Sequence, residues 1–413
     1  MKLHTFSIAP AIAALTAGSA LAIPSQNNVF QSNAPYTISN TDFLQTAGAT
    51  VSGTGNFTQE GIQGLAALND GLYGPQGGAN AHPPGLGAFS GGTGEMVNIA
   101  FPQANGVTLN SIVSTAAWDG ARASQAFQFE YQSTLLPGVW HRIATVANDP
   151  GQLPGNTNTQ SSITDSTGTL ASNISQIRFN YANTNFWGWN GFREIDATGA
   201  ASAAPSGPQF MKAIQINELY SPSGTDLLQG GGITTTASGT FTDEGVQGIP
   251  SLTDGVFGAA GGQGSNPPGL GAAGGNAGEF ITFGLDLAAS PGGYSLSGID
   301  VYAGWDGFRG GQNFQLSYSL VADPGTFLSL GAVDLDATAN NAPGGNVNTR
   351  SMLRDADGEL ATGVAAVRIS FNDVTFGFAG YREMDVFGTP VPEPASATFA
   401  AAGAALLLRR RRR

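Results

Sequence analysis

Apolar and polar residues alternate strictly along several short segments of the chain. Phe127, Phe129 and Tyr131 alternate with Gln128 and Glu130. Side chains of a β-strand point alternately to its two faces, so a period of two predicts strands with one buried and one solvent-exposed face. The same alternation recurs at residues 177–181, 314–318 and 367–371.

The segments between these alternating runs are rich in turn-forming residues. Glycine accounts for 60 of the 413 residues, and only 11% of residues are charged. Such a composition disfavours long amphipathic helices, whereas short strands broken by Gly, Pro, Asn and Asp are typical of all-β proteins. The pattern predicts an all-β fold of the jelly-roll or β-sandwich type.

The chain contains the same unit twice. Residues 55–74 (GNFTQEGIQGLAALNDGLYG) match residues 239–258 (GTFTDEGVQGIPSLTDGVFG), and further matched motifs follow in the same order. The repeat is too long for a solenoid, so each copy is expected to be a whole domain. We place the first sandwich at 23–199, a Ser/Ala/Pro/Gly-rich flexible linker at 200–213 and the second sandwich at 214–389.

The N-terminal segment, residues 1–22, has the features of a secretory signal peptide. Lys2 gives a positive start, and an uncharged apolar stretch follows. Ala20-Leu21-Ala22 then supplies a small-x-small cleavage site, which predicts cleavage between Ala22 and Ile23. The chain is therefore expected to be exported.

The C-terminal segment, residues 391–413, has three parts in a fixed order. Pro392, Glu393 and Pro394 precede a short apolar run, and five arginines close the chain. The run is shorter than the ~20 residues of a full bilayer crossing, and the arginines would stay cytoplasmic. This segment resembles the PEP-CTERM sorting signal of Gram-negative bacteria. The resemblance implies recognition by an exosortase and transient anchoring in the inner membrane, with final residence in the envelope or outside the cell. An ordinary tail anchor is the alternative.

Charge and cysteine content exclude several functions. The chain has 16 basic and 29 acidic residues, and Lys2 and the five terminal arginines lie in the terminal signals, so the region between is strongly acidic. Such a surface disfavours nucleic acid and anionic lipid but suits calcium or a neutral polymer, although acidity also serves solubility alone. There is no cysteine, which excludes disulfides, thiol catalysis and thiolate metal sites.

Several motifs recur in both copies in the order found in galactose-binding-like, or discoidin-type, β-sandwiches. The second copy matches better, with Leu-Thr-Asp-Gly at 252–255, Ile-Asp-Val-Tyr at 299–302 and Glu-Met-Asp-Val at 383–386. The resemblance implies carbohydrate binding and a structural calcium between the Asp-Gly loop and the glutamate of the last strand. That calcium site would use Asp70 with Glu194, and Asp254 with Glu383. Oxygen ligands suit a hard cation.

The alternative for these acidic residues is purely structural. The aspartates would cap tight turns and the glutamates would pair with Arg193 and Arg382. A second acidic loop at 355–359, matched in part by 165–169, is better explained as a hairpin turn.

Two repeated tryptophans are the best candidates for ligand contact. Each is followed by Asp-Gly-x-Arg just past a strand, so an indole could stack on a sugar ring while Asp and Arg bind its hydroxyls. Packing of both tryptophans in the sandwich cores, with Asp-Gly serving only to turn the chain, is the alternative. An aromatic cluster at 186–189 occurs in the first copy alone. The proposed ligand residues are Trp118, Asp119, Arg122, Trp305, Asp306 and Arg309.

No catalytic constellation is evident. Neither His82 nor His141 has a counterpart in the other copy, and no nucleophile elbow or zinc-helix motif occurs. The predicted function is that of a non-catalytic surface or matrix protein engaging polysaccharide, with exopolysaccharide and the sorting machinery as partners. A purely structural envelope or biofilm component is the alternative, and an extracellular hydrolase is the least favoured one.

Overall fold

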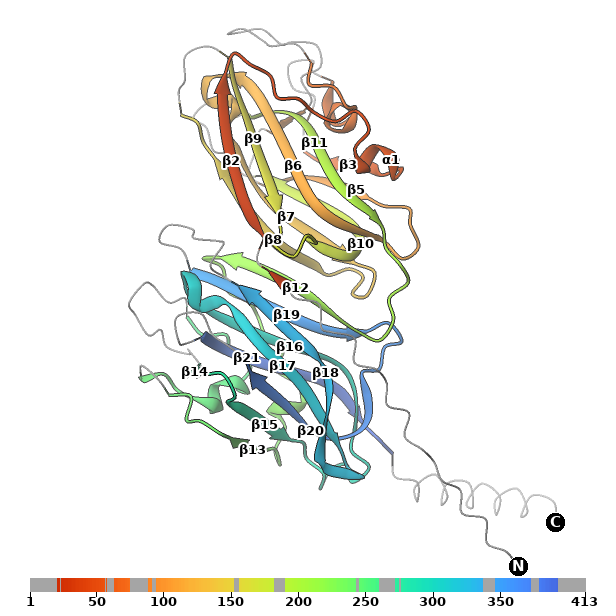
Figure 1. Cartoon of the computed structure of the whole chain (residues 1–413), viewed down its shortest axis with the longest axis vertical. Coiled ribbons are helices and arrows are strands. Elements are labelled where there is room, and N and C mark those ends of the chain that lie inside the picture. Colours follow the sequence, from red (N-terminus) through yellow and green to blue (C-terminus); the bar gives the residue numbers. More distant parts are fainter. Residues whose placement is uncertain are drawn as a thin grey trace, which may run out of the picture.

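A computed structural model of the chain contains two β-sandwiches stacked along its long axis (Figure 1). It describes residues 21–22, 24–55, 57, 63–74, 88–90, 94–151, 156–181, 190–242, 245–259, 272–274, 276–336, 346–372 and 379–392. The predicted all-β fold class is confirmed, because both sandwiches are built almost entirely of strands.

The first sandwich has two layers of five strands. One layer runs β8-β7-β10-β5-β3 and the other β2-β9-β6-β11-β4, with antiparallel pairing throughout. The layers join where β10 meets β6 in a short irregular pairing. The strands are β2 (Ser25–Ser32), β3 (Thr50–Thr54), β4 (Ala88–Ser90), β5 (Glu95–Ala100), β6 (Val107–Asp119), β7 (Gln125–Ser133), β8 (Trp140–Asn148), β9 (Asn156–Thr164), β10 (Ala171–Tyr181) and β11 (Asn190–Ala201).

The second sandwich repeats this topology strand for strand. Its layers run β18-β17-β20-β15-β13 and β12-β19-β16-β21-β14, and β16 joins them by a short pairing with β20. The predicted duplication is therefore a duplication of the whole sandwich. The strands are β12 (Pro208–Ile216), β13 (Thr234–Ala237), β14 (Ala272–Gly274), β15 (Phe280–Gly284), β16 (Tyr294–Asp306), β17 (Gln312–Leu320), β18 (Asp323–Asp336), β19 (Asn346–Asp355), β20 (Ala361–Phe371) and β21 (Ala379–Pro390).

Helices in the described part of the chain are single turns or little more. The short helix α1 (Phe43–Thr46) precedes β3, and its counterpart in the second sandwich is a 3-10 turn, η4 (Leu227–Gln229). Within the ranges described, none has the length and apolar character needed to cross a bilayer. The other 3-10 helices are η2 (Gly64–Asn69), η3 (Gly120–Ala123), η6 (Ile249–Leu252) and η7 (Gly307–Gly310).

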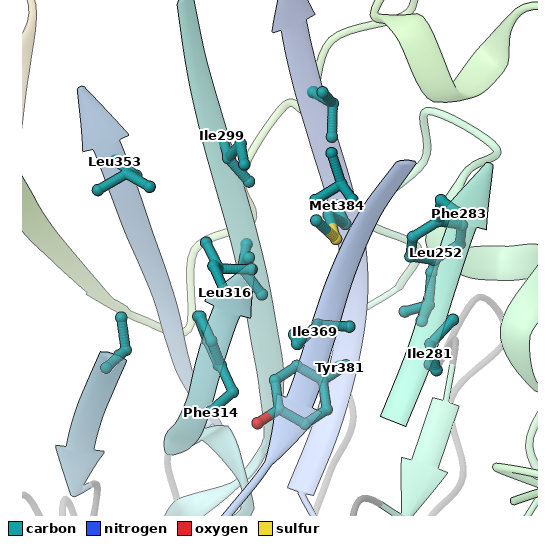
Figure 2. Close-up of a cluster of buried hydrophobic side chains, with 14 of the residues drawn as sticks. Leu252, Ile281, Phe283, Ile299, Phe314, Leu316, Leu353, Ile369, Tyr381 and Met384 are labelled. Carbon is teal, nitrogen blue, oxygen red and sulfur yellow. The ribbon is translucent and has the colours of Figure 1, made fainter. Parts of the chain in front are cut away.

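The apolar face of each alternating strand lies between its two layers. In the second sandwich Phe314 and Leu316 of β17 meet Ile369 of β20 and Ile299 of β16, as Figure 2 shows. The first sandwich has an equivalent core, in which Phe129 and Phe179 pack with their ring centroids 5.3 Å apart. The strands predicted from the period-two pattern are thus present, and their apolar faces are buried as expected.

The predicted linker at 200–213 is shorter in the structure than in the sequence pattern. β11 continues to Ala201 and β12 begins at Pro208, so only residues 202–207 lie between strands. Pro208 is compatible with this because β12 is an edge strand and Pro208 is its first residue.

The two sandwiches pack directly against each other through an apolar cluster. Leu135 and Leu136, in the turn between β7 and β8, pack on the outer face of the second sandwich. That face is formed by Met211 of β12, Met352 of β19 and Tyr302 of β16. The two modules, which were expected to be joined by a flexible linker, are therefore in contact in this structure, where the apolar outer face of one sandwich is covered by the other.

Polar contacts add to this interface. Lys212 Nζ forms an ion pair with Asp165, and both side chains are buried. Arg142 Nη1 lies 2.6 Å from Glu218 Oε1, and the Tyr131 hydroxyl donates a 2.9 Å hydrogen bond to the Lys212 carbonyl. A buried charge left without its partner is strongly destabilising. The Lys212–Asp165 ion pair therefore favours this one placement of the two sandwiches.

The two terminal signals fall largely outside the described residues. Leu21–Ala22 form β1, a parallel pairing with Leu335 and Asp336 of β18. Ile23 lies outside the described residues, as do Glu393 and Pro394, whereas Pro392 follows the end of β21.

Candidate functional site

The repeated Arg-Glu-x-Asp motif places two carboxylates on one face of the last strand of each sandwich. In β11 these are Glu194 and Asp196, which are two residues apart and therefore point to the same side. Asp42, at the N-terminus of α1, lies beside them. Carboxylate oxygens of the three residues all lie within 4.8 Å of one another, and we call this group the first carboxylate cluster.

The second sandwich contains the same cluster, made of Asp226, Glu383 and Asp385, again within 4.8 Å of one another. Asp226 caps η4 as Asp42 caps α1, and each accepts a 2.7 Å hydrogen bond from the backbone N–H two residues on. All three residues of this second carboxylate cluster are buried. The recurrence of the cluster in both copies indicates that both sandwiches require these three carboxylates.

The glutamates of both clusters are fully buried, with relative exposures of 0%. Burial, followed by the charges of Asp196, Asp70 and Asp42, raises the pKa of Glu194 to about 9. The pKa of Glu383 is likewise raised to about 9, by burial and then by Asp385, Asp254 and Asp226. Ionised carboxylates at this spacing repel one another, so the clusters need either protons or a cation.

Several oxygens of the clusters have no hydrogen-bond partner among the described residues. Both oxygens of Glu194 are in this state, although the Gly71 N–H is near enough to oppose slightly the rise in the glutamate's pKa. In the second cluster one oxygen of each of Asp226, Glu383 and Asp385 is unpartnered. Buried carboxylate oxygens without donors are the ligands that a hard cation prefers.

The sequence-predicted metal residues are only part of this arrangement. Glu194 and Glu383 stand at the centres of the clusters. Asp70 and Asp254 lie close enough to raise the pKa of those glutamates, and each also caps a turn through a 2.9 Å hydrogen bond from a backbone N–H. Turn capping was the structural alternative for the aspartates, and both aspartates do cap turns.

The structural alternative for the glutamates does not hold. Among the described residues no ion pair joins Glu194 to Arg193 or Glu383 to Arg382. The Arg382 guanidinium instead donates to the carbonyl of Gly304 at 2.6 Å and to that of Phe257 at 3.3 Å. Arg193 donates in the same way to the carbonyls of Ala117 and Tyr73. The two arginines therefore tie the last strand to a neighbouring strand and loop, and no ion pair to either glutamate occurs in the described part of the chain.

Sequence reasoning missed four cluster members, although the signal was present. Asp196 and Asp385 belong to the quoted Arg-Glu-x-Asp repeat, at the spacing that shares a strand face with the glutamate. Asp42 and Asp226 stand in a second short repeat, Thr-Asp-x-Leu-Gln, at residues 41–45 and 225–229.

Trp118 and Trp305 are the last residues but one of β6 and β16, and both are 1% exposed. The Arg122 guanidinium lies 4.7 Å from the Trp118 ring centroid, and that of Arg309 lies 4.6 Å from the Trp305 ring. The indoles are therefore packed as the core alternative expected, and they present no ring face to solvent. The arginines remain partly exposed at the same strand ends.

The remaining predicted residues fall into three groups. Asp119 and Asp306 end β6 and β16 opposite Asn156 and Asn346. The loop at 355–359 is a tight turn, because Gly358 N donates to the carbonyl of Asp355 at 3.0 Å. It is not the expected hairpin turn, because β19 and β20 on either side of it do not pair with each other and lie in different layers. The aromatic cluster at 186–189 lies outside the described residues.

No protein-family model and no curated protein matches the chain. Solved structures with some similarity include the Clostridium perfringens domain CpGH89CBM32-5 in complex with GalNAc-β-1,3-galactose, at 18% identity and a TM-score of 0.27, covering 40% of this chain and 99% of that chain. A fucolectin from Morone saxatilis serum is 11% identical with a TM-score of 0.27, covering 86% and 100%. Allantoicase from Saccharomyces cerevisiae is 12% identical with a TM-score of 0.26, covering 84% and 92%. Similarity at this level assigns no function to the chain.

Proposed function

We propose that the chain is an exported, non-catalytic protein whose two β-sandwiches engage polysaccharide. Each sandwich would hold a structural calcium at its carboxylate cluster. The main observation behind the proposal is that the second sandwich repeats the first, both in the carboxylate cluster and in the arginine held over a buried tryptophan. The same two features are kept at the same strands of both copies, which favours a recurring binding role over a solubility role.

The donor set of each cluster fits calcium. Asp42, Glu194 and Asp196 would hold one ion and Asp226, Glu383 and Asp385 the other, all through oxygen atoms. Oxygen-only donors favour a hard cation, and the described clusters contain no histidine that would favour zinc or copper. A bound cation would neutralise the buried carboxylates and fix the last strand against the N-terminal turn of its sandwich.

Ligand binding is proposed for the arginines at the ends of β6 and β16. Stacking on Trp118 and Trp305 holds the Arg122 and Arg309 guanidiniums in a fixed orientation. A planar guanidinium presents several N–H donors to hydroxyl or carboxylate oxygens, which are the polar groups of polysaccharides. Two such sites in one chain would add to avidity for a repetitive ligand.

Replacement of both Arg122 and Arg309 by alanine is expected to weaken polysaccharide binding about tenfold or more, the loss of roughly 1.4 kcal/mol. Glycan-array or polysaccharide pull-down measurements test this. The matched control is Arg178→Ala with Arg368→Ala, because these arginines stack on Trp140 and Phe327 elsewhere in the sandwiches. Equal loss in both variant pairs would contradict the assigned site, and no glycan signal from the wild type would favour a purely structural envelope role.

Export is proposed from the terminal segments. The protein recovered outside the inner membrane is expected to begin at Ile23, as N-terminal peptide sequencing would show. Cleavage there would remove β1 and expose the edge of β18. A product that keeps Met1 and stays in the cytosol would overturn this part of the proposal, including sorting through Pro392, Glu393 and Pro394.

A further inference from the structure

We propose that cation binding at the second carboxylate cluster is coupled to docking of the first sandwich, through Tyr302 and Arg350. The inference rests on the proposed calcium site and goes beyond it by assigning that site a role in the relative placement of the two sandwiches. It concerns the second cluster alone, since the first cluster has no such connection.

The second cluster is adjacent to Tyr302 on the outer face of the sheet. In the β16–β21 register Tyr302 stands opposite Glu383, and Asp300 stands opposite Asp385. The Tyr302 hydroxyl is 3.1 Å from Asp385 Oδ2, to which it donates a hydrogen bond. The other oxygen of Asp385 is unpartnered and the side chain is fully buried, so this carboxylate joins the cluster to Tyr302.

Tyr302 in turn supports an arginine that faces the first sandwich. The Arg350 guanidinium lies 5.2 Å from the Tyr302 ring centroid and 2.5 Å from Asp300 Oδ2. Asp300 also accepts from Arg354 Nη1 at 2.8 Å. These residues form a continuous chain of contacts from the carboxylate cluster to the arginines.

The two arginines lie within electrostatic range of residues of the first sandwich. Burial lowers the pKa of His141 to about 4, with the charges of Arg350 and Arg354 acting in the same direction and that of Asp300 opposing them. Burial raises the pKa of Tyr131, and the Lys212 backbone and the charge of Arg350 oppose that change. Tyr302 belongs to the apolar cluster on which Leu135 and Leu136 pack. The chain of contacts therefore ends at the interface, and both its polar and its apolar parts depend on Tyr302.

The first sandwich has other residues at the strand positions equivalent to Tyr302, Asp300 and Arg350. Its register places Thr115 opposite Glu194 and Val113 opposite Asp196, where the second sandwich has Tyr302 and Asp300. Gln160 stands opposite Thr115, in place of Arg350 opposite Tyr302. Aromatic and charged residues therefore connect cluster and interface only in the copy whose outer face is covered.

The direction of the coupling follows from the charges. A cation would hold the oxygens of Asp226, Glu383 and Asp385 together within 4.8 Å and so fix the position of Asp385. Without a cation, protons neutralise the cluster, and no ligand bond holds Asp385 in place. Movement of Asp385 releases the Tyr302 hydroxyl and loosens the surface on which the first sandwich docks. Binding of a cation at the second cluster and docking of the first sandwich are thus expected to favour each other.

A pair of spin labels tests the coupling, because the chain has no cysteine of its own. Labels at Ser52→Cys in β3 and Thr326→Cys in β18 occupy exposed positions, one in each sandwich. With calcium the inter-label distance distribution is expected to be narrow, and with chelator it is expected to broaden. Glu383→Gln should be broad under both conditions, while Glu194→Gln should keep the calcium response.

Tyr302→Phe separates coupling from binding. It retains the ring but loses the hydrogen bond to Asp385, so calcium titration should still show two sites while the distance distribution no longer responds to calcium. Two calcium sites with a distribution that chelator leaves unchanged would overturn the coupling and leave the calcium proposal intact. No calcium binding by the wild type in titration would remove both.

Discussion

Replacement of Trp305 by alanine is expected to lower the free energy of unfolding by about 3–5 kcal/mol, the cost typical of removing a large buried aromatic side chain. Trp305 is 1% exposed and packs beside Val246, with the Arg309 guanidinium over its ring. A Cβ placed on Gly380 would come within 3.0 Å of the indole, so the backbone of β21 also packs directly against it. Urea denaturation measures the loss. Trp118→Ala should give a similar result for the first sandwich.

The matched control is Trp140→Ala, because Trp140 is partly exposed at the start of β8 and its loss should cost less. A Trp305→Ala protein that keeps wild-type stability but loses polysaccharide binding would contradict the burial of the indole and restore the stacking hypothesis. A protein that loses both would be explained by unfolding alone. The arginine variants are therefore the proper test of binding.

Removal of calcium is expected to have the second large effect. A ligand at 100 times its dissociation constant stabilises the folded state by about 2.7 kcal/mol per site. In domains of this size each kcal/mol shifts the melting temperature by about 2–4 °C. Chelator should therefore lower the melting temperature by roughly 5–10 °C, as calorimetry or circular dichroism would show.

Variants of the two carboxylate clusters test this prediction one calcium site at a time. Glu194→Gln and Glu383→Gln should each abolish one calcium site and part of the shift. Without calcium, at neutral pH, they should be about as stable as the wild type, because the raised pKa already keeps each glutamate protonated there. Asp149→Asn, in an exposed turn, is the control for loss of an acidic residue. Identical wild-type melting curves in calcium and in chelator would refute the calcium proposal.

The β-strands and the duplication could be predicted because they depend on local pattern. Phe127, Phe129 and Tyr131 read as one strand face without knowledge of their partners, and the structure buries that face in β7. The repeat of Glu194 at Glu383 pointed to the right region of the last strand. It did not show that Asp42 and Asp226 would complete the clusters, because they come from segments more than 150 residues away in the chain.

The docking of the sandwiches could not be predicted from composition. Small and polar residues at 200–213 suggested a flexible linker, but the orientation of the sandwiches depends on Lys212 meeting Asp165 and on Leu135 meeting the face that contains Met352. Neither contact leaves a periodic signal in the sequence. Comparison of Tyr302 with Thr115, and of Arg350 with Gln160, shows in retrospect which copy carries the covered face.

Sequence pattern alone was enough to establish two all-β domains, since strand alternation and turn chemistry are properties of neighbouring residues. The burial of Trp118 and Trp305, the membership of the carboxylate clusters and the contact between sandwiches became known from the folded arrangement. All three depend on side chains that are distant in the chain and adjacent in space. Whether an indole faces solvent, or a carboxylate lacks a donor, follows from what the rest of the fold places against it.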